Sequence, residues 1–222
     1  LGLVSSARAI VAGVTLARAL IGDADVLRRQ EILEIGSQME GHPDNVAPAV
    51  FGGATVSWMN EETSEVGSVR LTPPDDIHPV AFIPDFELRT AAARAALPAT
   101  VPHGDASFNV ARGALLAAVL SGNAQASGGV DLHSLLMEAT RDRLHQEQRR
   151  AAMEPSLALV DWLRGAGFAA VVSGAGPTVL SLESVGADIR RDAAAAGWRV
   201  VPMGVAPQGV QITRGSLSKV EF

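Results

Sequence analysis

The sequence predicts an α+β fold, in which helices and antiparallel sheets share the chain without a regular strand–helix–strand series. Three observations support this prediction. The chain opens with two stretches of helical apolar spacing, strand-type patterns occupy residues 54–84, and helical patterns dominate from residue 86 onward. Because strands and helices are grouped along the chain rather than strictly alternating, the pattern favours antiparallel sheets over a parallel one.

The composition excludes several classes of protein. Of the 222 residues, 47% are hydrophobic and 19% are charged, with a net charge of −6, which is too apolar for a disordered chain. No stretch reaches the ~18 uninterrupted apolar residues of a membrane span, so no membrane association is expected. The chain has no basic excess, which argues against nucleic-acid binding. The absence of Cys excludes disulfides and Cys-ligated zinc, and fits a reducing compartment such as the cytoplasm.

The first part of the chain is expected to form helices and then strands. Residues 5–21 are mostly small and apolar with only two arginines, which predicts a helix buried on most sides. A signal peptide is a poorer interpretation because nothing basic precedes the apolar run. The remaining predictions are a helix at 25–39, a polar turn at 40–45, a short helix at 46–51 closed by two glycines, a strand at 54–58, a hairpin tip at 60–69, and strands at 69–71 and 79–84.

The second part is expected to be richer in helices. The predicted helices are at 86–97, 106–121, 131–148, 155–166 and 187–196, and the predicted strands are at 168–172, 178–182, 198–205 and 209–213. Strand-rich sequence gives way to helices near residue 84. We therefore expect two domains, at residues 1–84 and 85–222.

The first candidate for chemistry is the sequence Gly-Leu-Val-Ser-Ser-Ala at residues 2–7, which opens the first predicted helix. A helix N-terminus presents unpaired N–H groups and a partial positive charge, which suit a phosphate. The hydroxyls of Ser5 and Ser6 can bind a phosphate-bound Mg²⁺, although simple helix capping is the commoner role of such a pattern. The Gly-Lys-Ser/Thr ending of a Walker A loop is absent, and Lys219 is the only lysine of the chain.

The second candidate combines Glu34 with the polar turn Glu-Gly-His-Pro-Asp-Asn at residues 40–45. Carboxylates can hold Mg²⁺, and Asn or His can orient a hydroxyl substrate. For single members a structural role is the better interpretation, since Asp44 can cap the next helix and a lone His is usually structural. The crowding of polar residues between two apolar helices is what points to a site.

The third candidate is Val-Ser-Gly-Ala-Gly-Pro-Thr at residues 172–178, between two predicted strands. Two glycines and a proline in a tight loop allow the backbone to come close to another group. An ordinary hairpin turn is an equally good interpretation of this loop by itself. It is not a Gly-x-Ser-x-Gly nucleophile elbow, because the glycine spacing around Ser173 differs.

Taken together and in this order, the three segments resemble the homoserine kinase branch of the GHMP kinase superfamily. The most specific part is Glu-Gly-His-Pro-Asp-Asn-Val-Ala-Pro-Ala at residues 40–49, where sister branches such as mevalonate kinase differ. The resemblance covers essentially the whole chain and has an actinobacterial character, consistent with the bias toward Arg and Ala. Further similar segments lie at residues 88–98, 101–106, 142–149 and 155–160.

The resemblance implies a fold and a reaction. The expected fold is the GHMP kinase fold, with a partial N-terminal domain of the ribosomal S5 type and a C-terminal ferredoxin-like α/β sandwich. The expected reaction is ATP-dependent phosphorylation of the side-chain hydroxyl of L-homoserine in threonine biosynthesis. Another small-molecule GHMP kinase and a non-catalytic remnant of the family are the alternatives. A homodimer is an open option.

The resemblance also implies residues for ATP and Mg²⁺. The turn at the start of the first helix would hold the triphosphate, supported from the second domain by the glycine-rich loop. The residues expected at ATP are Gly2, Leu3, Val4, Ser5, Ser6, Ala7, Ser173, Gly174 and Gly176, and those expected at Mg²⁺ are Ser5, Ser6 and Glu34.

A further set is implied for the substrate. Asn45 falls where other superfamily members carry a catalytic Asp, and Asn cannot act as a carboxylate base, so this branch relies on orienting the hydroxyl. Arg94 and Arg149 match the family's substrate arginines, whose guanidinium groups can grip an α-carboxylate. The residues expected to bind substrate are His42, Asp44, Asn45, Thr90, Arg94 and Arg149, of which Asn45, Arg94 and Arg149 are also expected to act in catalysis.

Two residues depart from the family pattern. Val4 stands where the family has a second glycine, and a β-branched residue is poorly suited to positive φ. Arg8 replaces a small alanine in the first helix. The family's first motif, which contacts the substrate amino group, would lie before Leu1, so we expect an N-terminal domain truncated at its start.

Overall fold

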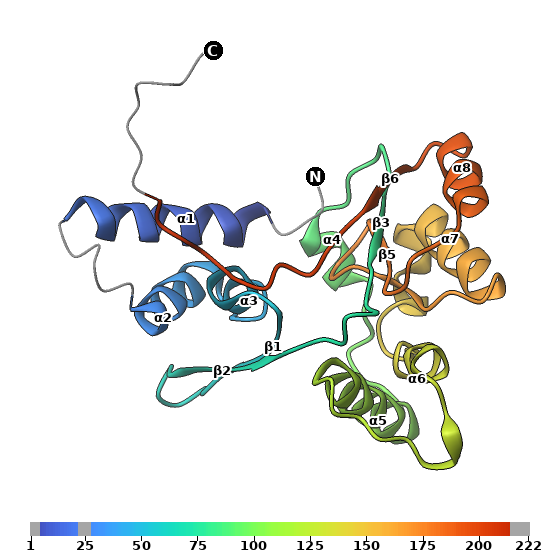
Figure 1. The fold of residues 1–222 in the computed structure, drawn as a ribbon, viewed down its shortest axis with the longest axis horizontal. Coiled ribbons are helices and arrows are strands. Elements are labelled where there is room, and N and C mark those ends of the chain that lie inside the picture. The colour runs from blue at the N-terminus through green and yellow to red at the C-terminus, as the bar shows by residue number, and fades with distance from the viewer. Residues whose placement is uncertain (1–4, 22–27, 214–222) are drawn as a thin grey trace. The chain divides into compact units, whose positions relative to one another are not determined.

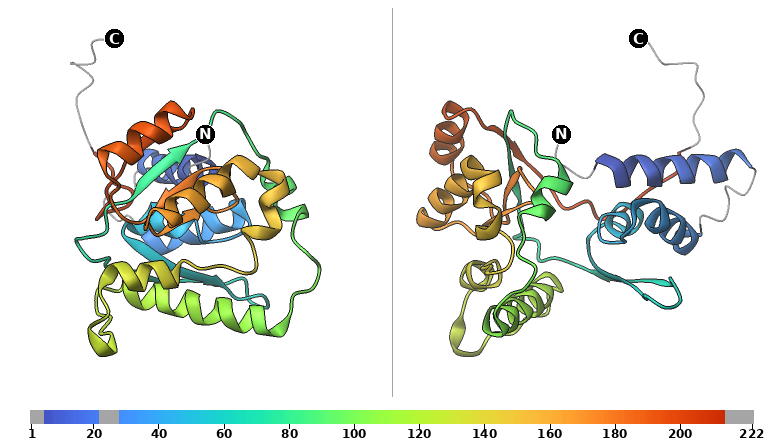
Figure 2. Two further views of the ribbon diagram at one scale, coloured as in Figure 1. Left: turned by 90° about the vertical axis from the view of Figure 1, so that its right-hand side faces the viewer. Right: turned by 180° about the vertical axis from the view of Figure 1, so that it is seen from behind.

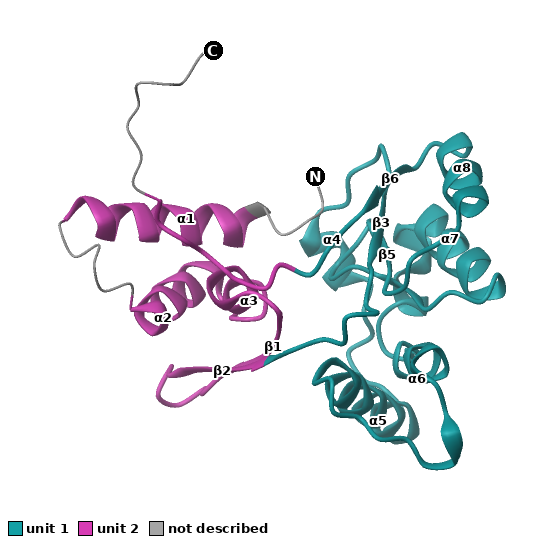
Figure 3. Cartoon of the chain, viewed as in Figure 1, with its two compact units in different colours: residues 1–3, 71–205 teal, residues 4–70, 206–222 magenta. Residues whose placement is uncertain are grey.

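The computed structural model describes residues 5–21 and 28–213, apart from the side chain of Ser5. The chain forms two compact units (Figures 1 and 3). Unit 1 contains residues Leu71–Val205, and unit 2 contains the described parts of Val4–Arg70 and Ala206–Phe222. Each unit has its own hydrophobic core.

Unit 2 contains three helices and a hairpin among its described residues. They are α1 (Ser5–Leu20), α2 (Arg29–Glu40), α3 (Val46–Phe51), β1 (Ala54–Met59) and β2 (Val66–Leu71), with β1 and β2 paired in a two-stranded sheet. Buried aliphatic residues from all three helices, among them Val11, Ile32 and Val46, form its core. Helix α2 ends at Gly41, whose φ of 87° lets its N–H donate to the carbonyl of Ser37.

Helix α1 is buried on one face, so the prediction of a helix buried on most sides is wrong. Ala7, Val11 and Thr15 lie four residues apart and face the core. Leu16 and Leu20, by contrast, are 59% and 78% exposed. The number of apolar residues in a helix predicts how much surface could be buried, but the packing partners decide which side is covered.

Residues 206–213 form no strand, which corrects the prediction of a final strand at 209–213. The segment instead runs against α3, where Val210 N–H donates to the carbonyl of Ala49 at 2.9 Å. Glycines make this approach possible, because a Cβ on Gly52 would collide with the backbone of Gln208, and a Cβ on Gly209 with the carbonyl of Val50. The segment is therefore held by close backbone packing rather than by a strand ladder.

Unit 1 is built on an antiparallel sheet with the strand order β4-β5-β3-β6. The predicted preference for antiparallel pairing is thereby confirmed. Its strands are β3 (Val80–Ile83), β4 (Ala170–Val172), β5 (Val179–Ser181) and β6 (Arg199–Pro202). Its helices are α4 (Thr90–Ala95), α5 (His103–Leu120), α6 (Leu132–Ala139), α7 (Glu154–Gly165), α8 (Ala187–Ala195) and the short 3₁₀ helices η1 (Ser127–Gly129) and η2 (Glu147–Ala152).

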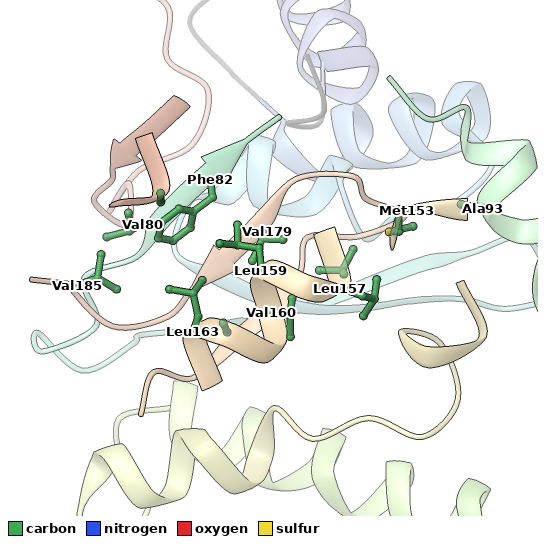
Figure 4. Close-up of a cluster of buried hydrophobic side chains, with 13 residues drawn as sticks. Val80, Phe82, Ala93, Met153, Leu157, Leu159, Val160, Leu163, Val179 and Val185 are labelled. Carbon is green, nitrogen blue, oxygen red and sulfur yellow. The ribbon is translucent and has the colours of Figure 1, made fainter. Parts of the chain in front are cut away.

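Helix α7 covers the sheet of unit 1 with one apolar face. Leu157, Val160 and Leu163 recur at helical spacing and are buried with Phe82 and Val179 of the sheet (Figure 4). Helices α5 and α6 lie side by side (Figure 2) and share a second cluster that includes Val119 and Leu136. The sheet and α7 thus form the support for the β4–β5 loop.

Three predicted helices are longer than the structure shows. Helix α2 begins at Arg29 rather than residue 25 (residues 22–27 lie outside the described part), and α4 covers only Thr90–Ala95 of the predicted 86–97. Phe86 and Leu88 pack against the core from a bend and an irregular segment, and residues 86–89 are not helical. The helix predicted at 131–148 ends at Ala139 and is followed by a turn.

Strand β3 belongs to unit 1, because it pairs with β5 on one side and β6 on the other. The compact units therefore divide the chain at Leu71 and again at Ala206. The division into family domains at 1–84 and 85–222 stays a prediction. Within residues 5–21 and 28–213, none of the helices is long and apolar enough to cross a membrane.

A pair of isoleucines in α2 tests the packing of unit 2. Ile32 is fully buried, whereas Ile35, three residues later, is 39% exposed. We expect Ile32→Ala to lower the free energy of unfolding by about 2–5 kcal/mol, because it leaves a cavity. Ile35→Ala should cost less than about 1 kcal/mol. Urea denaturation of both variants measures the difference, and equal losses would contradict the described packing of α2.

Candidate functional site

The glycine-rich loop at residues 173–178 is a hairpin turn anchored to α7. Ser173 N–H donates to the carbonyl of Thr178 at 2.8 Å, which closes the turn between β4 and β5. The hydroxyl of Ser156, buried on α7, donates to the carbonyl of Pro177 at 2.6 Å. Gly176 has a φ of 87°, and a Cβ there would lie 2.7 Å from Sδ of Met153. Ser156 and Met153 therefore hold the loop at Pro177 and Gly176. A Cβ at Gly174, by contrast, would meet only open space.

Arg149, on η2, joins this loop to α4. Its Nε donates to the carbonyl of Ala93 at 3.2 Å, and its Nη1 donates to the carbonyl of Gly174 at 3.2 Å. Burial lowers the pKa of the Arg149 guanidinium, the negative charge of Asp142 opposes that shift, and the positive charge of Arg94 adds to it. The side chain is therefore a partly desolvated cation with another cation nearby.

Arg94 and Thr90 complete this part of the site on α4. Both side chains are exposed, and their spacing of four residues places them on the same face of the helix. Within the described part of the chain, neither Arg94 nor Arg149 forms an ion pair with a carboxylate. Arg149 therefore contacts both Gly174 of the loop and α4, the helix that carries Arg94 and Thr90, all within unit 1.

Asp142 is an important residue that sequence reasoning did not single out. Its carboxylate accepts hydrogen bonds from the N–H groups of His145 at 2.9 Å and Gln146 at 2.6 Å, and from Nδ2 of Asn109 at 2.6 Å. Burial by itself raises the pKa of Asp142, but these hydrogen bonds outweigh it and lower the pKa to about 2. The sequence pattern favours a helix at 131–148 and so conceals this turn, although Asp side chains in turns often accept from the next few N–H groups.

In unit 2, His42, Asp44 and Asn45 lie in the turn between α2 and α3, as predicted. Nδ1 of His42 is 2.5 Å from Oδ1 of Asp44, but the nitrogen makes no hydrogen bond of acceptable geometry. The same Asp44 oxygen accepts from the N–H of Asn45 at 3.0 Å. The Asn45 side chain makes no capping hydrogen bond to α3.

The predicted ATP and metal residues of unit 2 have other partners. The hydroxyl of Ser6 donates to Glu40 Oε1 at 2.7 Å, and Glu34 accepts from Nε2 of Gln30 at 2.9 Å. These hydroxyl and carboxylate oxygens are of the type that Mg²⁺ prefers. No group of three or more His, Asp or Glu side chains within residues 5–21 and 28–213 is arranged to hold a metal. Ala7 is buried in α1, while Gly2, Leu3 and Val4 lie outside the described residues.

Comparisons with known proteins match both units. The model of the GHMP kinases N terminal domain matches residues 1–53, and that of the GHMP kinases C terminal domain matches residues 117–196. A homoserine kinase from Corynebacterium kroppenstedtii is 42% identical over 223 residues, covering 97% of this chain and 68% of the relative. The chain belongs to the homoserine kinase family. A homoserine kinase from Streptomyces avermitilis is 43% identical over 95% of this chain and 66% of its own length.

The fold of the homoserine kinase family agrees with the structure. The crystal structure of a homoserine kinase from Cytophaga hutchinsonii superposes with a TM-score of 0.73 at 23% identity, covering 90% of this chain and 64% of that one. The predicted α+β class and GHMP kinase fold are confirmed. The chain spans about two thirds of the length of the curated family members, 66% for the relative from Streptomyces avermitilis and 65% for one from Streptomyces coelicolor.

Gly176 and Gly174 form a matched pair that tests the loop. Gly176→Ala combines a positive φ with a contact to Met153, which is buried and cannot move freely. We expect it to lower the free energy of unfolding by about 2–4 kcal/mol. Gly174→Ala has the backbone penalty alone, about 1–2 kcal/mol. Denaturation curves compare the two, and a larger loss for Gly174→Ala would refute the described packing.

The low pKa of Asp142 predicts a pH dependence of stability. Its folded pKa of about 2 lies below the ordinary value of 3.8, so the ionised carboxylate stabilises unit 1 above about pH 4. That contribution is lost as the pH falls through the folded pKa. The wild-type chain should therefore lose stability between pH 4 and 2 more steeply than Asp142→Asn. Denaturation midpoints across this pH range measure the effect, and parallel curves would contradict it.

Proposed function

We propose that the protein transfers the γ-phosphoryl group of ATP to the side-chain hydroxyl of L-homoserine, giving O-phospho-L-homoserine and ADP. The observation that carries the proposal is the pair Arg94 and Arg149, two arginines without carboxylate partners in the described chain. Homoserine has an α-carboxylate, and its binding would relieve the repulsion between these two cations. The names of the relatives support the same substrate.

Arg149 is well suited to bind a carboxylate. Two of its N–H groups donate to the carbonyls of Ala93 and Gly174, which hold the guanidinium in place. An arginine has five N–H donors, so Arg149 keeps donors for a ligand. Arg94 and Thr90 lie on the exposed face of the adjacent helix and supply a second cation and a hydroxyl.

In unit 2 we assign the residues around α1 and α2 to ATP and to the reacting hydroxyl. The N-terminus of α1 would bind phosphate oxygens, and the oxygens of Ser6 and Glu34 would hold Mg²⁺, which neutralises phosphate charge. Asn45 would orient the hydroxyl by hydrogen bonding, with His42 and Asp44 beside it in the turn. Phosphoryl transfer depends mainly on positioning and charge neutralisation, so an amide in place of a carboxylate base is chemically sufficient.

The proposed reaction also suggests a pathway and a location for the protein. The proposed product, O-phospho-L-homoserine, would serve threonine biosynthesis, and we propose a cytoplasmic location for the protein. Another GHMP kinase activity and a non-catalytic remnant are less well supported, because the reported relatives are homoserine kinases. A homodimer stays a prediction.

The substrate assignment is tested by steady-state kinetics of the full-length protein. Arg94→Ala should raise the KM for homoserine at least tenfold and change the KM for ATP less than twofold, because it removes one carboxylate contact. Arg190→Ala, an exposed arginine of α8 in the same unit, is the matched control and should change neither. Equal turnover of homoserine and mevalonate by the wild-type protein would overturn the proposed function.

A further inference from the structure

Asp142 organises the turn that leads into η2. Its two carboxylate oxygens accept from three consecutive backbone N–H groups, those of Leu144, His145 and Gln146, at 3.2, 2.9 and 2.6 Å. Its side chain is only 13% exposed, so these bonds are shielded from water. The carboxylate thereby takes the place of backbone carbonyls as the acceptor for residues 144–146, which lead into η2.

The turn is joined directly to the neighbours of Arg149. The Gln146 side-chain oxygen accepts from the N–H of Val172 at 2.8 Å, at the end of β4 and immediately before the glycine-rich loop. Three residues after Gln146, the Arg149 guanidinium donates to Gly174 of that loop and to Ala93 of α4. A short series of hydrogen bonds therefore connects Asp142 to the position of the Arg149 side chain.

Helix α5 holds the turn from the other side. Asn109 uses both ends of its amide, since Nδ2 donates to Asp142 at 2.6 Å and Oδ1 accepts from the N–H of Arg143 at 2.9 Å. The guanidinium groups of Arg112 and Arg143 lie 3.8 and 3.9 Å from the ring centroid of Phe108. The turn at 142–146 is thus fixed to a rigid helix by polar and stacking contacts.

The hydrogen-bonded group of Asn109, Asp142 and Gln146 lies outside the hydrophobic cores of unit 1. Asn109, Asp142 and Gln146 belong to none of the clusters of buried apolar side chains in unit 1. Their hydrogen bonds lead instead to the loop and the helix that Arg149 contacts.

We propose that Asp142, held by Asn109 of α5, is a positioning residue that keeps the Arg149 guanidinium between the carbonyls of Ala93 and Gly174, with its remaining N–H groups available to a carboxylate. The identity of that carboxylate as homoserine rests on the proposed function. The positioning itself is a property of unit 1 and can be measured without substrate.

The variant Asp142→Asn tests the proposal in the full-length protein. Asn keeps the shape but presents an NH₂ group toward backbone N–H donors, so it cannot accept on both sides. We expect the KM for homoserine to rise at least tenfold and the KM for ATP to change less than twofold. The NMR resonance of Arg149 Nε–H should broaden or shift, because its contact with Ala93 becomes intermittent. Asp142→Glu should restore part of the homoserine affinity.

The matched control is Asp161→Asn, which removes a more exposed carboxylate paired with Arg150. It should leave both KM values and the Arg149 Nε–H resonance unchanged. Asn109→Ala removes one partner of Asp142 and should act in the same direction with a smaller effect, which keeps the test valid if Asp142→Asn does not fold. An unchanged resonance with equal changes in both KM values would overturn the proposal. If the wild-type protein fails to phosphorylate homoserine, the proposed function falls, while the resonance still decides the role of Asp142.

Discussion

The bridge that Arg149 makes between two backbone carbonyls determines the candidate site of unit 1. It joins three segments that are distant in the sequence, namely η2, α4 through Ala93, and the β4–β5 loop through Gly174. A planar guanidinium can donate in several directions at once and still keep donors for a ligand, which an ammonium group does less well. The nearly complete use of arginine for positive charge in this chain is consistent with that requirement.

The electrostatics around Arg149 combine partial burial with two nearby charges of opposite sign. Burial lowers the pKa of the Arg149 guanidinium, the charge of Asp142 opposes that shift, and Arg94 adds a like charge nearby. Partial burial of a cation without an ion pair is unfavourable, which fits the proposed binding of a carboxylate ligand at Arg149. The negative charge of Asp142 offsets part of the repulsion between Arg149 and Arg94. The hydrogen bonds that Asp142 accepts order the turn and lower its own pKa to about 2.

Unit 2 depends on a different constraint, the close approach of backbone segments. Gly41 ends α2 in a left-handed conformation, which begins the turn that contains His42, Asp44 and Asn45. Gly52 and Gly209 allow residues 206–210 to lie against α3, so a segment from the end of the chain packs with helices from its beginning. Gly41 thus allows the polar turn after α2, and Gly52 and Gly209 allow a backbone approach that a side chain would block.

Local patterns in the sequence determined the type and order of most elements, the antiparallel character of the sheet, and the candidate residues of the three motifs. The reason is that apolar spacing, glycine and proline act over a few residues. Only the tertiary structure decided which face of α1 is buried, that β3 pairs within unit 1, and that residues 209–213 follow α3 without forming a strand. It alone revealed that Asn109 binds Asp142, because the two residues lie 33 positions apart in the sequence. Packing partners and hydrogen bonds over such separations leave no periodic signal in the sequence.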